Sequence, residues 1–343
     1  MNTRENFLSC LHMQPHTGVP SFLFDTSFGT GIAGYPVSEI YGTGFDGEKS
    51  ARSICAGRRF LDHDAVPGSM ICMDTRVFGA TTVQFRDRPP MIEKAAFSDP
   101  SELYRHDVSE IYCRTADEII RSCNLVKEMD PDAAVAAYVP SPFLFSAILR
   151  GLEPLMMDLL SDMDYVKDIM AFTKSCCDIL AKRHADETES DCSIIPGAYD
   201  NVDLIGAEAV REVCIPSLRD MIRKLHEADM PIIFHPHGEF TKESGTSTLR
   251  DFIDAGFDCI YYGENCDHRR MCQLTNGKTS VMGGIDTSTT IYLGPDTKVR
   301  TDTEDVLAQT DGYDFIYSCS CSIDQNLNAD RLRIMMDTVR AHR

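Results

Sequence analysis

Residues 230–239 read Met-Pro-Ile-Ile-Phe-His-Pro-His-Gly-Glu, an apolar run bounded by proline and glycine that ends in two histidines. A short apolar run with such boundaries is typical of a buried β-strand. His235 and His237 are one residue apart where this strand would end, so their imidazoles can converge on one metal ion. This stretch therefore carries both the prediction of the fold and the prediction of the site.

Strand-like and helix-like segments alternate on both sides of this stretch. Repeated strand–helix units imply parallel strands joined by right-handed crossovers. About eight strands favour a (β/α)8 TIM barrel over an open doubly wound sheet. No glycine-rich nucleotide-binding fingerprint occurs in the pattern. The other segments predicted as barrel strands are residues 19–24, 133–139, 193–200, 259–262, 279–286 and 314–317.

We expect one TIM-barrel domain over residues 1–343. Residues 101–343 would form the regular β/α units, which begin with a long helix from Ser101 to about residue 126. Residues 1–100 would contain a short N-terminal helix, the first strand and then an elaboration of the barrel.

The elaboration is expected to be irregular from residue 26 to residue 100, because glycine and proline are frequent there. Within it, residues 75–78 and 82–85 are rich in β-branched and aromatic side chains and predict a hairpin. The fold class expected for the chain is thus a TIM barrel with an N-terminal helical and hairpin elaboration.

Composition argues against several classes of partner. The formal net charge of −20 argues against nucleic acid and anionic membranes, which require basic patches. No apolar run approaches the roughly 20 residues of a membrane span, and the opening residues lack the core of a signal peptide. Fourteen cysteines in so long a chain indicate a reducing compartment rather than a disulfide framework. We therefore expect a cytoplasmic protein of an anaerobic or strongly reducing cell.

A second site-like segment follows the predicted strand at residues 314–317. It reads Ser-Cys-Ser-Cys-Ser at residues 318–322. Zinc binds imidazole nitrogen and thiolate sulfur, and its catalytic sites keep one position open. If the two strand ends meet, the chain has a mixed nitrogen and sulfur site, with the choice between Cys319 and Cys321 open. The alternative is that these side chains only satisfy buried polar groups.

Acidic residues also stand at predicted strand ends, where TIM barrels collect their catalytic groups. Asp200 and Asp286 are candidate acid/base or substrate-orienting groups, and Asp25 ends the first strand. Glu239 or Glu264 could supply a fourth metal ligand or orient an imidazole. The alternative role for these carboxylates is to cap strand ends or to form salt bridges.

Several motifs occur along the chain in an order that resembles the uroporphyrinogen decarboxylase superfamily, and within it the zinc-dependent, corrinoid-linked methyltransferases. Each motif is short, and together they extend over nearly the whole length. The motifs are Thr-Arg-Glu-Asn-Phe at residues 3–7, Phe-Gly-Ala at 78–80, Asp-Pro-Ser-Glu-Leu at 99–103, Pro-Ser-Pro-Phe at 140–143, His-Pro-His-Gly at 235–238, Gly-Gly-Ile-Asp at 283–286 and the segment 315–323.

The resemblance implies a site and a set of cofactors. It places the family's last zinc cysteine at Cys321, so the implied zinc ligands are His235, His237 and Cys321. It also implies a corrinoid carried by a separate partner protein, a small methylated substrate and a homodimer. The decarboxylase itself holds porphyrin carboxylates with an arginine-rich N-terminal segment that this chain lacks, so we do not expect decarboxylation of porphyrinogens.

One departure from the family pattern bears on the reaction. Methyltransferases that serve coenzyme M have His-x-Cys where this chain has a second histidine, His237. A single thiolate leaves zinc with a net positive charge and greater Lewis acidity. This favours demethylation of an ether, amine or thiol, with the methyl group passing to cobalt(I) of the corrinoid.

Three other functions stay open on the sequence. A coenzyme M-type enzyme would methylate a thiol instead. A zinc hydrolase could also use His-x-His, although in amidohydrolase-like barrels that pair typically ends the first strand, and here it ends about the fifth. A non-catalytic member of the superfamily would bind a corrinoid or another tetrapyrrole without metal chemistry.

Overall fold

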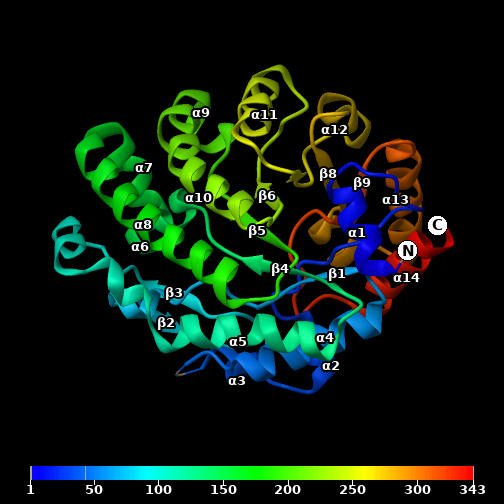
Figure 1. Cartoon of the computed structure of the whole chain (residues 1–343), viewed down its shortest axis with the longest axis horizontal. Coiled ribbons are helices and arrows are strands. Elements are labelled where there is room, and N and C mark those ends of the chain that lie inside the picture. The colour runs from blue at the N-terminus through cyan, green and yellow to red at the C-terminus, as the bar shows by residue number, and fades with distance from the viewer. Residues whose placement is uncertain (1, 43, 343) are drawn as a thin grey trace.

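The computed structural model describes residues 2–42 and 44–342, and in that part of the chain the main sheet is a curved set of seven parallel strands (Figure 1). Each strand pairs with the next in the order β1-β4-β5-β6-β7-β8-β9. The bounds are β1 (Ala65–Pro67), β4 (Ala134–Tyr138), β5 (Cys192–Gly197), β6 (Ile232–Pro236), β7 (Cys259–Tyr261), β8 (Ser280–Ile285) and β9 (Phe315–Cys319).

Residues 20–24 close this sheet into a barrel by pairing with both of its edges. The Phe22 amide donates to the Tyr317 carbonyl oxygen in β9 at 2.9 Å, and the Ala65 amide in β1 donates to the Ser21 carbonyl oxygen at 3.0 Å. Both bridges are parallel. The first strand predicted from the sequence therefore supplies the eighth strand position of the barrel, between β9 and β1. The predicted (β/α)8 barrel is confirmed.

Helices surround the strands (Figure 1). Their amphipathic pattern explains the arrangement: α10 buries Ile215, Leu218, Ile222 and Leu225, which recur at helical spacing on one face. The helices are α1 (Thr3–Leu11), α2 (Phe28–Ala33), α3 (Val37–Tyr41), α4 (Gly47–Leu61), α5 (Arg114–Met129), α6 (Pro142–Arg150), α7 (Leu152–Ser161), α8 (Met163–Glu187), α9 (Val202–Ala209), α10 (Ile215–Glu227), α11 (Glu243–Ala255), α12 (His268–Thr275), α13 (Asp296–Thr310) and α14 (Ala329–Ala341).

Helix α1 covers the end of the barrel at which the strands begin. Phe7 and Leu11 join the buried cluster of inward-pointing strand residues that includes Phe22 and Ile233. The Cys10 thiol reaches the carbonyl oxygen of Phe315, the first residue of β9, at 3.6 Å. With this end filled by apolar side chains, polar groups that follow the strands are left to gather at the opposite end of the barrel.

The region from residue 26 to residue 100 is more regular than the sequence suggested. It contains α2, α3, α4 and strand β1, where we expected irregular chain. The glycines were interpreted as signs of irregular chain, but at least one of them allows two helices to pack closely. A Cβ atom at Gly47 of α4 would lie 2.2 Å from the Glu118 carbonyl oxygen of α5. The Asp46 side chain caps α4 by accepting from the Lys49 amide at 2.9 Å.

The predicted hairpin exists but has other strands. Residues Thr75–Phe78 form a 3₁₀ turn, and the hairpin pairs β2 (Thr81–Val83) with β3 (Met91–Lys94). The turn forms because the Asp74 carboxylate accepts from the Arg76 amide and Gly79 ends it with a positive φ of 89°. The local capping groups therefore override the β propensity of the apolar residues between them.

The long helix expected from Ser101 is also wrong at its beginning. Two 3₁₀ turns, Pro100–Arg105 and Val108–Ile111, precede α5, which begins at Arg114. Asp99 and Asp107 accept hydrogen bonds from the amides two residues further on and start a new turn each time. The predicted helix at 207–227 is likewise divided by a π-helical turn, Val210–Cys214.

Within residues 2–42 and 44–342, no helix combines the length and the apolar character that crossing a membrane requires.

Candidate metal centre

Three side chains capable of binding a metal meet where β6 and β9 end. They are His235 in β6, His237 just after it, and Cys321 two residues after β9. One donor atom from each lies within 4.8 Å of the others. The Cys321 Sγ atom is 3.7 Å from His237 Nε2. The two strand ends singled out in the sequence therefore do meet in space.

His235 is held in the form that binds metals. Its Nδ1 lies 2.8 Å from the Tyr261 carbonyl oxygen, which fixes the proton on Nδ1 and leaves the lone pair on Nε2. Burial, and then the neighbouring His237, lower the pKa of His235 to about 3, so the imidazole is neutral. Among the described residues, its buried Nε2 has no hydrogen-bond partner. An oriented, neutral imidazole with a free lone pair is a prepared metal ligand.

One spacing between the donors, the 3.7 Å from Cys321 Sγ to His237 Nε2, fits zinc. Bond lengths of about 2.0–2.3 Å to nitrogen and sulfur put the ligands of a tetrahedral zinc site roughly 3.3–3.8 Å apart. Burial lowers the pKa of His237, against the charge of Glu264, and burial raises the pKa of the Cys321 thiol. A divalent cation would stabilise the thiolate, because metal binding deprotonates cysteine.

The structure separates the two cysteines that the sequence left open. The Cys319 thiol is buried and lies 3.8 Å from the Met335 sulfur of α14, on the outer side of the strand. Of the fourteen cysteines, all free, Cys113 and Cys321 are the two that are not fully buried. Cys321 is thus the cysteine of this pair that faces the histidines.

Tyr261 of β7 connects the two halves of this cluster. Its ring stacks on His235 with centroids 3.9 Å apart and an interplanar angle of 23°. Its hydroxyl lies 2.9 Å and 3.2 Å from the carbonyl oxygens of Cys319 and Cys321, and it accepts from the Ser318 hydroxyl at 2.9 Å. No role for Tyr261 was singled out from the sequence. Its inward parity with Cys259 was the one available signal.

We expect Tyr261→Phe to weaken zinc binding about tenfold and to lower stability by about 1–3 kcal/mol, because carbonyl groups lose a buried donor. The ring remains to stack on His235, so the loss reports the hydroxyl alone. Competition with a chelator measures the zinc affinity, and urea denaturation measures the stability. Tyr262→Phe is the control, since that hydroxyl bonds His268 on α12 instead. Equal zinc affinities for wild type and Tyr261→Phe would show that the hydroxyl does not position the loop.

The carboxylates predicted as site residues have different surroundings. Glu239 turns back into its own loop, where it accepts from the Thr241 amide at 2.8 Å. Asp286 caps the π-helical turn Thr287–Tyr292 by accepting from two amides. Glu264 is close enough for its charge to act on both His237 and Cys321. Catalytic roles for Glu239 and Asp286 stay predictions, and so does a role for Glu264 at the metal.

Asp200 is fully buried beyond β5 and links the ends of β4 and β5. It is not part of the group formed by His235, His237 and Cys321, which we call the metal-type cluster. The Ser141 hydroxyl, which follows β4, donates to its Oδ2. Burial raises the pKa of Asp200 to about 6, against hydrogen bonds from Ser141 and Cys214. The carboxyl is neutral below this pH, and a catalytic role for Asp200 stays a prediction.

The raised pKa of Asp200 predicts a loss of stability with rising pH. The native pKa of about 6 lies above the ordinary value of 3.8, so the native state binds this proton more tightly than the unfolded state does. The contribution is complete below about pH 4 and is lost as the pH rises through about 6, by about 3 kcal/mol at most. Asp200→Asn should remove this part of the pH dependence. Denaturation curves between about pH 4 and pH 8 test it, and parallel pH profiles for both proteins would contradict it.

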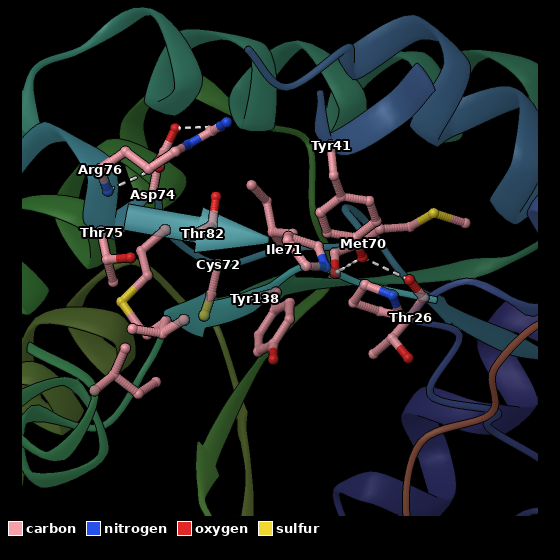
Figure 2. A pocket seen from close by; sticks show the side chains of 15 residues that line it. Thr26, Tyr41, Met70, Ile71, Cys72, Asp74, Thr75, Arg76, Thr82 and Tyr138 are labelled. Atoms are coloured by element: carbon pink, nitrogen blue, oxygen red, sulfur yellow. Dashed lines mark hydrogen bonds and ion pairs between the residues drawn. The ribbon is translucent and has the colours of Figure 1, made fainter. Parts of the chain in front are cut away.

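A cavity of about 350 Å³ lies at the same end of the barrel, and the described residues that line it do not include His235, His237 or Cys321. Figure 2 shows Tyr138 on one side of it and the Arg76–Asp74 pair on another. Tyr138, the last residue of β4, packs edge-to-face on Phe24 at 5.0 Å, and Phe24 lies edge-to-face with His235 at 6.3 Å. Two aromatic rings therefore separate the cavity from the buried imidazole.

Comparison with known proteins agrees with this architecture. A family model described as uroporphyrinogen decarboxylase (URO-D) matches residues 4–342. A methyltransferase from Methanosarcina mazei is 15% identical, with a TM-score of 0.78 and coverage of 99% of each chain. A putative vitamin-B12-independent methionine synthase from Listeria monocytogenes is 13% identical, with a TM-score of 0.53 and coverage of 94% of this chain and 96% of that chain. No curated protein has a significantly similar sequence. At these identities, the solved structures establish the fold.

Proposed function

The chain belongs to the uroporphyrinogen decarboxylase (URO-D) family, and on that basis we propose that it is a zinc-dependent methyltransferase that acts with a corrinoid protein. It would move a methyl group from a small methylated substrate to the cobalt of the corrinoid. The observation that carries the proposal is the convergence of His235, His237 and Cys321 at the open end of the barrel. The fold shared with the Methanosarcina mazei methyltransferase supports it.

His235, His237 and Cys321 would hold the zinc ion, with a fourth position left for substrate. Zinc bound by two nitrogens and one sulfur supplies Lewis acidity, which draws electrons from the atom that loses the methyl group. Tyr261 would hold the His235 ring in place by stacking on it, and would hold the Cys321 backbone in place through the hydrogen bond of its hydroxyl. Glu264 would act as a displaceable fourth ligand or orient His237, since its charge reaches both His237 and Cys321.

The single cysteine is the reason for proposing demethylation rather than methylation of a thiol. With one thiolate the donor set carries one negative charge, so a zinc ion there keeps a net positive charge. Such a site would favour substrates whose methyl group leaves an oxygen or nitrogen atom over the activation of a thiolate as a nucleophile. The aromatic pair Phe24 and Tyr138 shields one side of the cluster, which keeps water from the neighbourhood of His235.

Methylation of cob(I)alamin, followed optically with a panel of methyl ethers, amines and thiols, tests the function. We expect methylcobalamin to form with an ether or amine, in proportion to the zinc content. His237→Ala should lose both zinc and activity, whereas His12→Ala, a change at an exposed histidine, should retain both.

Three results would redirect the proposal. Methylation of a thiol from methylcobalamin, with no methylation of cob(I)alamin, would reverse the direction of transfer. Metal-dependent hydrolysis of esters or amides without cobalamin would make the protein a hydrolase. Purified protein with almost no zinc, and no loss of function in His237→Ala, would indicate a non-catalytic binding protein.

A further inference from the structure

Among the outer helices, a groove lies between α8 on one side and α9 with the following π-helical turn on the other. It consists of two adjoining hollows of about 440 and 400 Å³, whose walls share Met163, Glu212 and Val213. The end of α7 lines one of them, and α7 and α9 are neighbours in Figure 1. Along α8 the lining extends from Met163 to Lys174, a length of roughly 17 Å. This hollow, which we call the α8–α9 groove, is long enough for about three turns of a helix.

The groove is lined mainly by apolar side chains, several of which reach solvent. Met156, Met163 and Met170 line it, and methionine adapts its shape to a bound partner. Beside them, Leu160 is 86% exposed and Leu204 is 42% exposed. A cluster of exposed apolar side chains around a hollow is typical of a protein interaction site.

Helix α9 packs poorly against its own chain. Most of its eight residues are apolar, yet none of the eight, all of which the structure describes, is fully buried. Gly206 also interrupts its helical geometry with a positive φ of 78°. Helices in proteins gain most of their stability by packing an apolar face, so α9 would be stabilised by a partner in the groove. Asp203 of α9 accepts from the Glu239 amide at 2.6 Å, which joins α9 to the loop after β6.

The lysines that line the groove are neutralised within the chain. Lys167 Nζ lies 3.6 Å from an Asp164 carboxylate oxygen. Lys174 Nζ lies 3.1 Å from Asp178 and 2.7 Å from Asp220. These two lysines therefore leave no net positive charge in the groove.

The acidic side chains of the groove are not neutralised in this way. Within residues 2–42 and 44–342, Glu208 and Glu212 form no ion pair, and both are exposed. The groove is therefore apolar along its floor and negative at its edge. A second copy of this chain, with its formal net charge of −20, would be repelled, whereas a basic partner would be attracted.

We propose that the α8–α9 groove binds an amphipathic helix of a partner protein, with apolar side chains at helical spacing and lysine or arginine beside them. The apolar face of this helix packs on the methionines and on Leu160. Its basic flank pairs with Glu208 and Glu212. The groove is separate from the metal-type cluster and involves no methyl transfer, so this inference does not depend on the proposed function.

Fluorescence anisotropy titration of the full-length protein with three labelled peptides of equal length tests the inference. The first contains leucine and lysine with the leucines at helical spacing, the second has glutamate in place of each lysine, and the third is a scramble of the first without that spacing. We expect the first to bind at least about tenfold more tightly than either of the others. Hydrogen exchange should show protection by this peptide in α9 and in the first half of α8.

A charge variant tests the attraction by the groove. The double variant Glu208→Lys, Glu212→Lys changes two exposed side chains and should weaken binding of the leucine–lysine peptide by at least about tenfold. The control is the double variant Glu304→Lys, Asp305→Lys on α13, which changes the net charge equally at exposed positions outside the groove. It should bind the peptide within about twofold of wild type.

A second variant tests the apolar contact. Leu160→Ser truncates a side chain that is 86% exposed, so the fold should be kept, and the peptide should bind about tenfold more weakly. Leu293→Ser is the matched control, because Leu293 is 72% exposed but follows the π-helical turn Thr287–Tyr292, away from the groove lining. It should bind the peptide as wild type does.

The inference is overturned if the leucine–lysine peptide does not bind saturably, or binds no more tightly than either matched peptide. It is also overturned if either groove variant keeps the wild-type affinity, or if both charge variants lose affinity equally, since the net charge alone would then attract the peptide. Sedimentation of the protein alone tests the other occupant. A dimer that Leu160→Ser dissociates, together with no peptide binding, would assign the groove to a second copy and contradict the proposal.

Discussion

Replacing Cys321 with serine is expected to weaken zinc binding by about 100-fold or more and to abolish methylation of cob(I)alamin. Cys321 supplies the single sulfur among the three converging donors. A serine hydroxyl is not ionised at neutral pH and is a much poorer ligand for zinc than thiolate. Since loss of a group that only orients a ligand typically costs 10–100-fold in metal affinity, loss of a ligand itself should cost at least as much.

The measurement is the zinc dissociation constant by competition with a chelator, together with the rate of methylcobalamin formation. Serine is close to cysteine in size, and Cys321 is partly exposed, so the free energy of unfolding without metal should change by less than about 0.5 kcal/mol. Cys113→Ser is the control, because Cys113 is the other cysteine that is not fully buried and it lies before α5. Full zinc retention by Cys321→Ser would exclude the proposed ligand set.

The second large effect is expected for Gly284→Ala, which should lower the free energy of unfolding by about 3 kcal/mol or more. Gly284 of β8 pairs with Ser318 of β9, and a Cβ atom there would lie 1.7 Å from the Ser318 carbonyl oxygen. The obstacle is backbone inside the sheet, so only a shift of β9 could relieve it. That shift would move the segment leading to Cys321, so zinc affinity should fall as well.

Urea denaturation and chelator competition on the same protein measure both consequences of Gly284→Ala. The control is Gly44→Ala, because a Cβ atom at Gly44 would meet nothing within 4 Å. Its stability should stay within about 0.5 kcal/mol of wild type. If Gly284→Ala proved as stable as this control, the close approach of β8 and β9 would not be a constraint on the fold.

The sequence predicted the barrel well because apolar strand runs and amphipathic helices repeat in it. The apolar run at residues 230–235 contains most of β6, and the segment at residues 19–24 is the extended strand that closes the sheet into a barrel. The meeting of His235, His237 and Cys321 was also predictable, since polar residues that follow parallel strands gather at one end of a barrel.

What the sequence could not reveal depends on contacts between distant segments. From the sequence alone, Gly47 indicates a loop. Its role in close packing depends on α5, which lies against it in the structure. The turns that delay α5 depend on Asp99 and Asp107, whose capping geometry outweighs the helical pattern. The joining of both halves of the site by Tyr261 requires β6, β7 and β9 to be side by side, so no local motif announces it.

The orientation of a side chain along a bent strand end was equally hidden. Cys319 and Cys321 have the same parity, yet Cys319 faces Met335 of α14 while Cys321 faces His237. The neutral ion pair of Asp74 and Arg76 in the cavity wall is another case, because two charged residues in a sequence do not reveal that they cancel.

X-ray absorption at the zinc edge of the purified protein tests the central claim most directly. The account predicts about one zinc ion per chain, with one sulfur at about 2.3 Å and two histidine nitrogens at about 2.0–2.1 Å, and loss of the sulfur shell in Cys321→Ser. A protein without bound zinc, or a zinc shell with two sulfurs or with oxygen ligands alone, would contradict it.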